Sequence, residues 1–168
     1  MRKPDWFERK FQFGIPAGML PFFLERLEGT IARLEKKNRG QPDTILSHKP
    51  GGKWSVKEHI GHLAEVDEIA LRRIDEIVNG ISPMTPAVFE PKKDYNSQSA
   101  TQVLDYFAKN RMENLRKYKT LSDADCAMTS LHPRLKVMMS AIDLAFFDAE
   151  HDDHHLVKIS EIQSASRP

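Results

Sequence analysis

The segment AEHDDHHLVKI, residues 149–159, carries three of the chain's seven histidines within five residues. Residues four apart in a helix lie one turn apart on the same face, so His151 and His155 share a face. Two imidazoles at this spacing can bind one metal ion, and a third ligand from elsewhere would leave one coordination position open for water or substrate. The alternative is that both rings are half-buried and hydrogen-bonded to nearby aspartates.

Around this segment, apolar residues recur every three or four positions, which is typical of a helix face packed against a core. The resulting stripe consists of Leu144, Phe147, His151, His155, Ile159 and Ile162. The two histidines therefore interrupt a core-facing seam. His154 falls at the edge of the seam, where contact with solvent or an outer role around a metal suits it better. We expect this helix to run from about residue 140 to 163.

Three further helices are expected upstream. The first spans about residues 21–37, and the third runs to about residue 121 from a cap at Ser99 or Thr101. The second begins after Ser55, which forms the spacing of a capping box with Glu58, and ends near Gly80. Segments 81–97 and 122–139 read as long connections with little regular structure. Four such helices predict an all-α fold, a four-helix bundle with long crossover connections.

Composition narrows the class of protein. We expect a single domain over residues 1–168, in which the aromatic-rich residues 1–18 form an arm packed on the bundle. Arginine and lysine total 25 against 24 acidic residues, a formal charge of +1, so neither nucleic acid nor an anionic membrane is an expected partner. The charged N-terminus and the lack of an 18-residue apolar run predict a cytoplasmic protein. The single cysteine, Cys126, excludes an internal disulfide and a multi-cysteine zinc site.

A third metal ligand would have to come from the second helix, in the segment EHIGHLAE, residues 58–65. Helical phase places His59 on the apolar stripe and His62 toward its edge. Periodicity alone therefore favours His59, although a site near one end of the bundle could use an edge position.

Three motifs together resemble the DinB-like superfamily of metal-binding four-helix bundles. They are WSVKE at residues 54–58, GHLAE at residues 61–65 and HDDHHLVKI at residues 151–159. The resemblance covers about residues 20–163 and includes the order of the helices and the long second connection. That superfamily includes bacillithiol and mycothiol transferases and proteins described as metal-dependent hydrolases.

The resemblance implies a three-histidine site made of His62, His151 and His155, with His59 as a neighbour that could replace one of them. Three imidazoles and an open position suit Zn²⁺ or Ni²⁺. Nearby carboxylates could orient the rings by accepting their outer N–H groups; the candidates are Glu58, Glu65, Glu150 and Asp152.

For the activity, the resemblance implies transfer of a low-molecular-weight thiol, as co-substrate, to an electrophilic small molecule. A first alternative is hydrolysis of a small amide or ester by metal-bound water, with Glu58, Glu65 or Glu150 as general base. A second alternative is a non-catalytic bundle that a metal clamps or that binds a partner. A homodimer is also an expectation for this family.

Four other residues carry weaker signals. Arg72 and Arg73 could bind an anionic substrate group, but their acidic neighbours are more typical of surface ion pairs. His132 could line the mouth of the site or be an ordinary loop residue, and Trp54 is expected to anchor the core.

Overall fold

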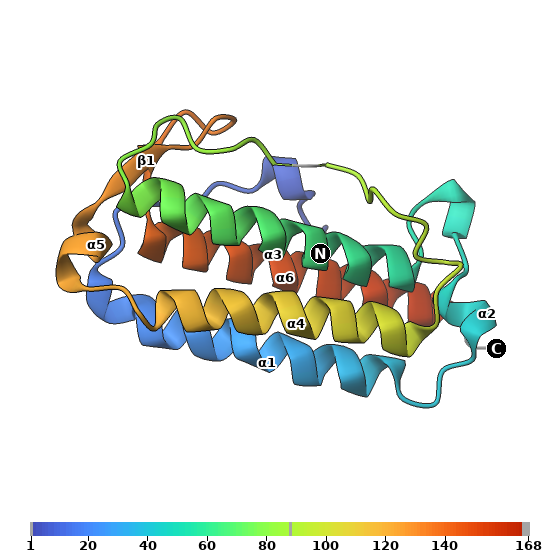
Figure 1. Ribbon diagram of the computed structural model, residues 1–168. Helices are drawn as coiled ribbons and strands as arrows, with labels where there is room; N and C mark the ends of the chain where they lie inside the picture. Colours follow the sequence, from blue (N-terminus) through green and yellow to red (C-terminus); the bar gives the residue numbers. More distant parts are fainter. Residues whose placement is uncertain (1, 88, 166–168) are drawn as a thin grey trace.

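The computed structural model describes residues 2–87 and 89–165, so Met1 of the predicted arm and Val88 of the predicted crossover lie outside the described part. Its four long helices are α1 (Leu20–Asn38), α3 (Val56–Val78), α4 (Ala100–Tyr118) and α6 (Ala141–Ala165) (Figure 1). Helix α1 packs against α4 and α6, and α3 packs against the same two helices. The predicted four-helix bundle is therefore confirmed, with α3 and α6 as neighbours.

The connection between α3 and α4 runs the length of the bundle, because these two helices point in the same direction (Figure 1). Hydrogen bonds record its path back along α3. The Thr85 amide donates to Glu76 near the end of α3, the Lys92 amide donates to Glu65 in the middle, and Lys57 near the start of α3 donates to the Gln98 carbonyl. This segment is the long crossover that the sequence predicts.

Local sequence signals explain where the helices begin. Ser55 Oγ accepts from the Glu58 amide while the Glu58 carboxylate accepts from the Ser55 amide, which confirms the predicted capping box. Ser99 and Gln102 form the same arrangement at α4, which identifies Ser99 as the cap. Gly80 has a φ of +67° just beyond α3, a conformation that glycine adopts without strain.

The prediction of an irregular loop over residues 122–139 was wrong. This segment contains the short helix α5 (Asp123–Ala127) and an antiparallel hairpin of β1 (Thr129–Leu131) and β2 (Met138–Ser140). Each strand has three residues, too few for an alternating pattern to show in the sequence. Other short elements are α2 (Asp43–Leu46) and the 3₁₀ turns Trp6–Glu8, Ala17–Met19 and Pro50–Gly52.

The core has two hydrophobic clusters with a polar layer between them. One cluster contains Leu27, Ile74, Leu115 and Leu144, and the other contains Leu34, Ile60, Phe107 and Ile159. Between these positions the four long helices contribute buried polar residues that hydrogen bonds join into one layer: Thr30, Asp67, Arg111 and Asp152.

Arg111 is the centre of this polar layer. Its Nε donates to Asp67, its two terminal nitrogens donate to Asp152 at 2.5 and 3.0 Å, and Nη1 also donates to the Leu27 carbonyl. Thr30 donates a further bond of 2.7 Å to Asp152. These bonds to α1 and α4 fix the orientation of α6 about its own axis. In this orientation His151 and His155 face α3.

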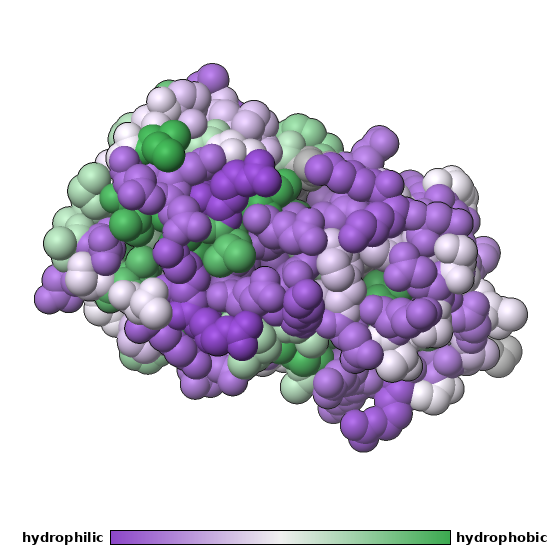
Figure 2. Space-filling view, viewed as in Figure 1, coloured by the Kyte–Doolittle hydropathy of each residue, from purple (hydrophilic) through white to green (hydrophobic). Residues whose placement is uncertain are grey.

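The N-terminal segment packs along α6. Its aromatic side chains Trp6, Phe11 and Phe13 contact Phe147, and the Gly14 amide donates to Asp143 at the start of the helix. Hydrophilic residues predominate on the face drawn in Figure 2, where hydrophobic ones gather toward the end that holds α5 and β1. Across the described residues, every helix is too short or too polar to cross a membrane.

Candidate metal centre

Three histidines from two helices meet between α3 and α6. One ring nitrogen from each of His62, His151 and His155 can be chosen so that all three atoms lie within 4.8 Å of one another. The rings of His62 and His155 are buried, and His151 is half-buried. These are the three residues that the resemblance selects. Among the described residues, no other group of three histidine, cysteine or acidic side chains brings its ligand atoms this close together.

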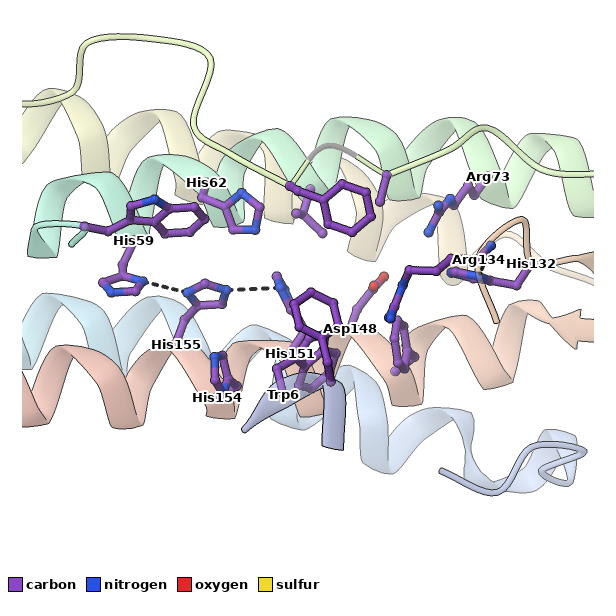
Figure 3. A pocket seen from close by; sticks show the side chains of 16 residues that line it. Trp6, His59, His62, Arg73, His132, Arg134, Asp148, His151, His154 and His155 are labelled. Atoms are coloured by element: carbon purple, nitrogen blue, oxygen red, sulfur yellow. Dashed lines mark hydrogen bonds between the residues drawn. The ribbon is translucent and has the colours of Figure 1, made fainter. Parts of the chain in front are cut away.

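His155 lies at the middle of a row of rings (Figure 3). Its Nε2 is 3.0 Å from His151 Nε2, and its Nδ1 is 2.8 Å from Nδ1 of His59. Two nitrogens that bind one tetrahedral zinc at about 2.0–2.1 Å lie about 3.3 Å apart, so the spacing of the two Nε2 atoms suits a shared ion. His59 contacts the opposite edge of His155 and does not face this position.

The surroundings keep these imidazoles neutral. Burial lowers the pKa of His62 to about 4 and that of His59 to about 3, and it holds the pKa values of His151 and His155 well below the usual range. The neighbouring rings add to the effect by mutual repulsion of their charged forms. Neutral imidazole is the form that binds a metal.

Two buried nitrogens of the cluster, Nδ1 of His62 and Nδ1 of His151, have no hydrogen-bond partner among the described residues. Unpartnered buried polar atoms are rare because each costs about 1–3 kcal/mol. Three neutral imidazoles that bring one nitrogen each within one ion's reach, two of them with a further unpartnered nitrogen, fit the donor set of a divalent metal.

Two tryptophans hold the histidine rings in place. Trp54 stacks parallel to His155 and lies 4.8 Å from His62, measured between ring centroids. Trp6, from the N-terminal segment, lies 5.1 Å from His151 and 5.5 Å from His154. Trp54 thus contributes to the site wall, whereas the sequence predicts only a core anchor.

A cavity of about 300 Å³ opens beside the histidines. Its walls are largely aromatic, and the cluster lies at one end while Arg73, Arg134 and His132 lie at the other (Figure 3). The hairpin supplies His132 and Arg134, so an element that the sequence pattern does not predict forms one end of the cavity. His132 therefore lines the site and is not an ordinary loop residue.

The structure does not bring the three predicted general-base candidates to the cavity. Glu58 closes the capping box and pairs with Lys49, Glu65 accepts from Tyr95 and from the Lys92 amide, and Glu150 pairs with Arg9 and Arg26. Each of these carboxylates is engaged in holding one part of the chain to another. Asp152, the fourth candidate for orienting the rings, is bound to Arg111 and Thr30.

Among the described residues that line the cavity, Asp148 is the one with a carboxyl group. It lies one turn before His151 on α6, makes no hydrogen bond within the described chain, and points into the space between the histidines and Arg73 (Figure 3). Burial raises its pKa to about 8, so the group carries a proton at neutral pH. Asp148 precedes His151 by three residues and His155 by seven, a spacing that predicts the same helix face for all three.

Helices α3 and α6 pack antiparallel and carry a three-histidine cluster between them. This arrangement is typical of four-helix bundles that bind a metal in their core. The model of the DinB superfamily matches residues 26–159, and the chain belongs to this superfamily. A search among curated proteins found no match.

Among solved structures, the chain is similar to YfiT from Bacillus subtilis, described as "a probable metal-dependent hydrolase with an unusual four-helix bundle topology". The TM-score is 0.80 with 19% sequence identity, over 94% of this chain and 93% of that chain. At this identity the likeness shows the shared fold.

Proposed function

We propose that this protein is a metal-dependent enzyme acting on a small molecule, in which His62, His151 and His155 hold one divalent metal ion, Zn²⁺ or Ni²⁺. The observation that carries the proposal is the convergence of three neutral imidazoles, two buried and one half-buried, at the end of a cavity large enough for a substrate. His59 supports His155 from behind by the hydrogen bond between their Nδ1 atoms.

The reaction that the site supports best is transfer of a low-molecular-weight thiol to an electrophilic carbon. A metal ion at the cluster would supply the acidity that converts a bound thiol, or a water, to its anionic form near neutral pH. The sulfur then forms a bond to the carbon, and the leaving group departs with its electron pair. Asp148 is protonated and lines the cavity, so it can donate a proton to that leaving group.

The remaining residues of the cavity bind and shield the reactants. Phe89, Phe147 and the two tryptophans give the cavity apolar walls, which suit an uncharged aromatic or aliphatic portion of a substrate. The same walls exclude water and favour attack by sulfur over attack by hydroxide.

Hydrolysis is the second candidate, and His154 is the observation that favours it. This ring lines the cavity 5.2 Å from His155, measured between centroids, and burial lowers its pKa to about 4. A neutral imidazole there can accept a proton from an attacking water.

A purely structural metal site fits the geometry less well. A clamping site would be closed by a fourth ligand, but the candidate for that position, His59, faces the far edge of His155. The cavity also leads to the histidines.

The test uses the zinc-loaded and the nickel-loaded protein with cysteine or glutathione and 1-chloro-2,4-dinitrobenzene. We expect thiol-dependent release of chloride that chelation and His155→Ala abolish. Hydrolysis of 4-nitrophenyl acetate without added thiol, lost in the same variant, would reverse the ranking of the two reactions. Absence of both activities in protein with full metal occupancy would contradict the enzymatic assignment.

A further inference from the structure

The end of the cavity remote from the histidines contains a buried arginine whose hydrogen bonds are incomplete. Arg73 is only 4% exposed, and its Nε donates to the Thr85 carbonyl at 2.8 Å. Among the described residues, its buried Nη2 has no hydrogen-bond partner and no carboxylate forms an ion pair with it. The bond to Thr85 holds the crossover through Nε, and Nη2 takes no part in it.

Two further donors lie beside Arg73. Arg134 lines the same cavity from the hairpin, with its guanidinium packed 4.9 Å from the ring centre of Phe7. His132 is buried, and its Nδ1 accepts hydrogen bonds from the amides of Arg134 and Leu135. Because Nδ1 is an acceptor, the proton of the neutral ring is on Nε2, which makes that nitrogen a donor.

Neither acidic group that acts on Arg73 neutralises this cluster. Asp148 and Glu76 both raise the pKa of Arg73, but neither forms an ion pair with it. Burial keeps Asp148 protonated at neutral pH, and Glu76 accepts from the Thr85 amide. Two guanidinium groups and one imidazole N–H therefore face a cavity that has no anion of its own. A guanidinium matches a planar carboxylate with two parallel hydrogen bonds.

We propose that Arg73, Arg134 and His132 form a subsite for a carboxylate group of the substrate. The inference rests on the proposed function for its reactive end, because the histidine cluster lies at the other end of the same cavity (Figure 3). His62 and Arg73 are eleven residues apart on α3, so their Cα atoms are separated by about 16 Å along the helix axis. Side chains that lean toward each other would shorten the distance between their polar ends. The substrate class is thus a small carboxylic acid with an electrophilic centre at its opposite end and an apolar middle.

This assignment separates two neighbours that the sequence presents as a pair. Arg72 is exposed on the outer surface of α3, as the surface interpretation predicts, whereas Arg73 turns into the bundle. The surface interpretation was therefore wrong for Arg73. Arg72→Gln removes the same charge from the adjacent position without touching the cavity, and is a matched control.

The test measures binding of 3-phenylpropanoate and of its neutral analogue 3-phenylpropanamide to the metal-free protein by NMR titration. We expect the acid to bind at least about tenfold more tightly than the amide, as charge-assisted hydrogen bonds imply. This preference should disappear in Arg73→Gln and persist in Arg72→Gln. Equal affinity for acid and amide, or an unchanged preference in Arg73→Gln, would overturn the subsite.

Two additions keep the test decisive. If Arg73→Gln does not fold, Arg134→Gln at the cavity mouth should reduce the preference by about threefold or more, and an unchanged value there would overturn the proposal. Tighter binding of phenyl phosphate than of 3-phenylpropanoate would overturn the choice of carboxylate. Because the protein is metal-free, these results are independent of whether the histidines bind metal or support turnover.

Discussion

Nδ1 of His59 lies 2.8 Å from Nδ1 of His155, and this contact sets the direction of the second nitrogen of His155. With one edge of the ring bonded to His59, Nε2 is directed toward His151. The histidine that helical phase favoured as a ligand therefore holds the proposed ligand His155 in position.

We expect His59→Ala to weaken metal binding by about 10–100-fold without abolishing it, since partners behind a ligand typically contribute this much. Competition with a chromogenic chelator measures the affinity. His48→Ala is the matched control, because His48 is exposed and lies outside the cavity. Complete loss of metal in His59→Ala would show that His59 is itself a ligand. An unchanged metal affinity would show that His59 does not position His155.

Loss of Arg111 should destabilise the bundle strongly. Arg111→Met leaves the buried carboxylates Asp67 and Asp152 without their common partner, and breaking a buried ion pair costs about 3–5 kcal/mol. Urea denaturation measures the free energy of unfolding. Arg116→Met, on the exposed face of the same helix, should stay within about 0.5 kcal/mol of the parent. A loss below about 1 kcal/mol in Arg111→Met would show that the polar layer does not hold the helices together.

Gly61 allows the crossover to approach α3. A Cβ built there lies 2.3 Å from the ring of Tyr95, so Gly61→Ala must displace a buried aromatic ring. We expect destabilisation of about 1–3 kcal/mol by thermal or urea unfolding. Gly29→Ala, in α1 with open space around its Cβ, should instead stabilise by about 0.5–1 kcal/mol. Equal effects of the two substitutions would contradict the close approach of Tyr95.

Asp148 should make stability depend on pH in the metal-free protein. Its pKa is raised to about 8 in the folded state by burial, against 3.8 for the model group. Between these values the folded state binds more protons than the unfolded state, so stability falls as pH rises from about 4 to about 8. Asp67, raised to about 6, acts in the same direction over part of this range.

Comparison with Asp148→Asn isolates the contribution of Asp148. The free energy of unfolding of the parent should decrease relative to that of the variant as pH rises through this window. Parallel pH profiles would show that Asp148 is ionised in the folded protein at neutral pH, and would remove it as a proton donor.

Much of the fold could be predicted because its signals are local. The caps at Ser55 and Ser99 and the seam of α6 depend on nearest neighbours in the helices, and the structure has them where the sequence predicts them. Helical phase favoured His59, whereas the close group of ring nitrogens contains His62, and this difference has a physical reason. The first three turns of α3 are buried on nearly all sides, so an apolar stripe carries little information there.

The far end of the cavity could not be predicted in the same way. The strands that position His132 and Arg134 are too short to show a pattern. Buried Arg73 and exposed Arg72 have the same side chain, so only the tertiary packing tells them apart. The general-base candidates failed to reach the cavity because a helix presents acidic side chains on several faces, and tertiary contacts decide which face meets the site.

Metal analysis of the purified protein beside His62→Ala, His151→Ala and His155→Ala tests the three-histidine centre most directly. Circular dichroism would verify that each variant is folded. We predict about one divalent ion per chain in the parent and loss of that ion in every variant, because three protein ligands are needed to retain it. Full occupancy in His151→Ala, or a folded parent that binds no zinc or nickel at all, would contradict the account.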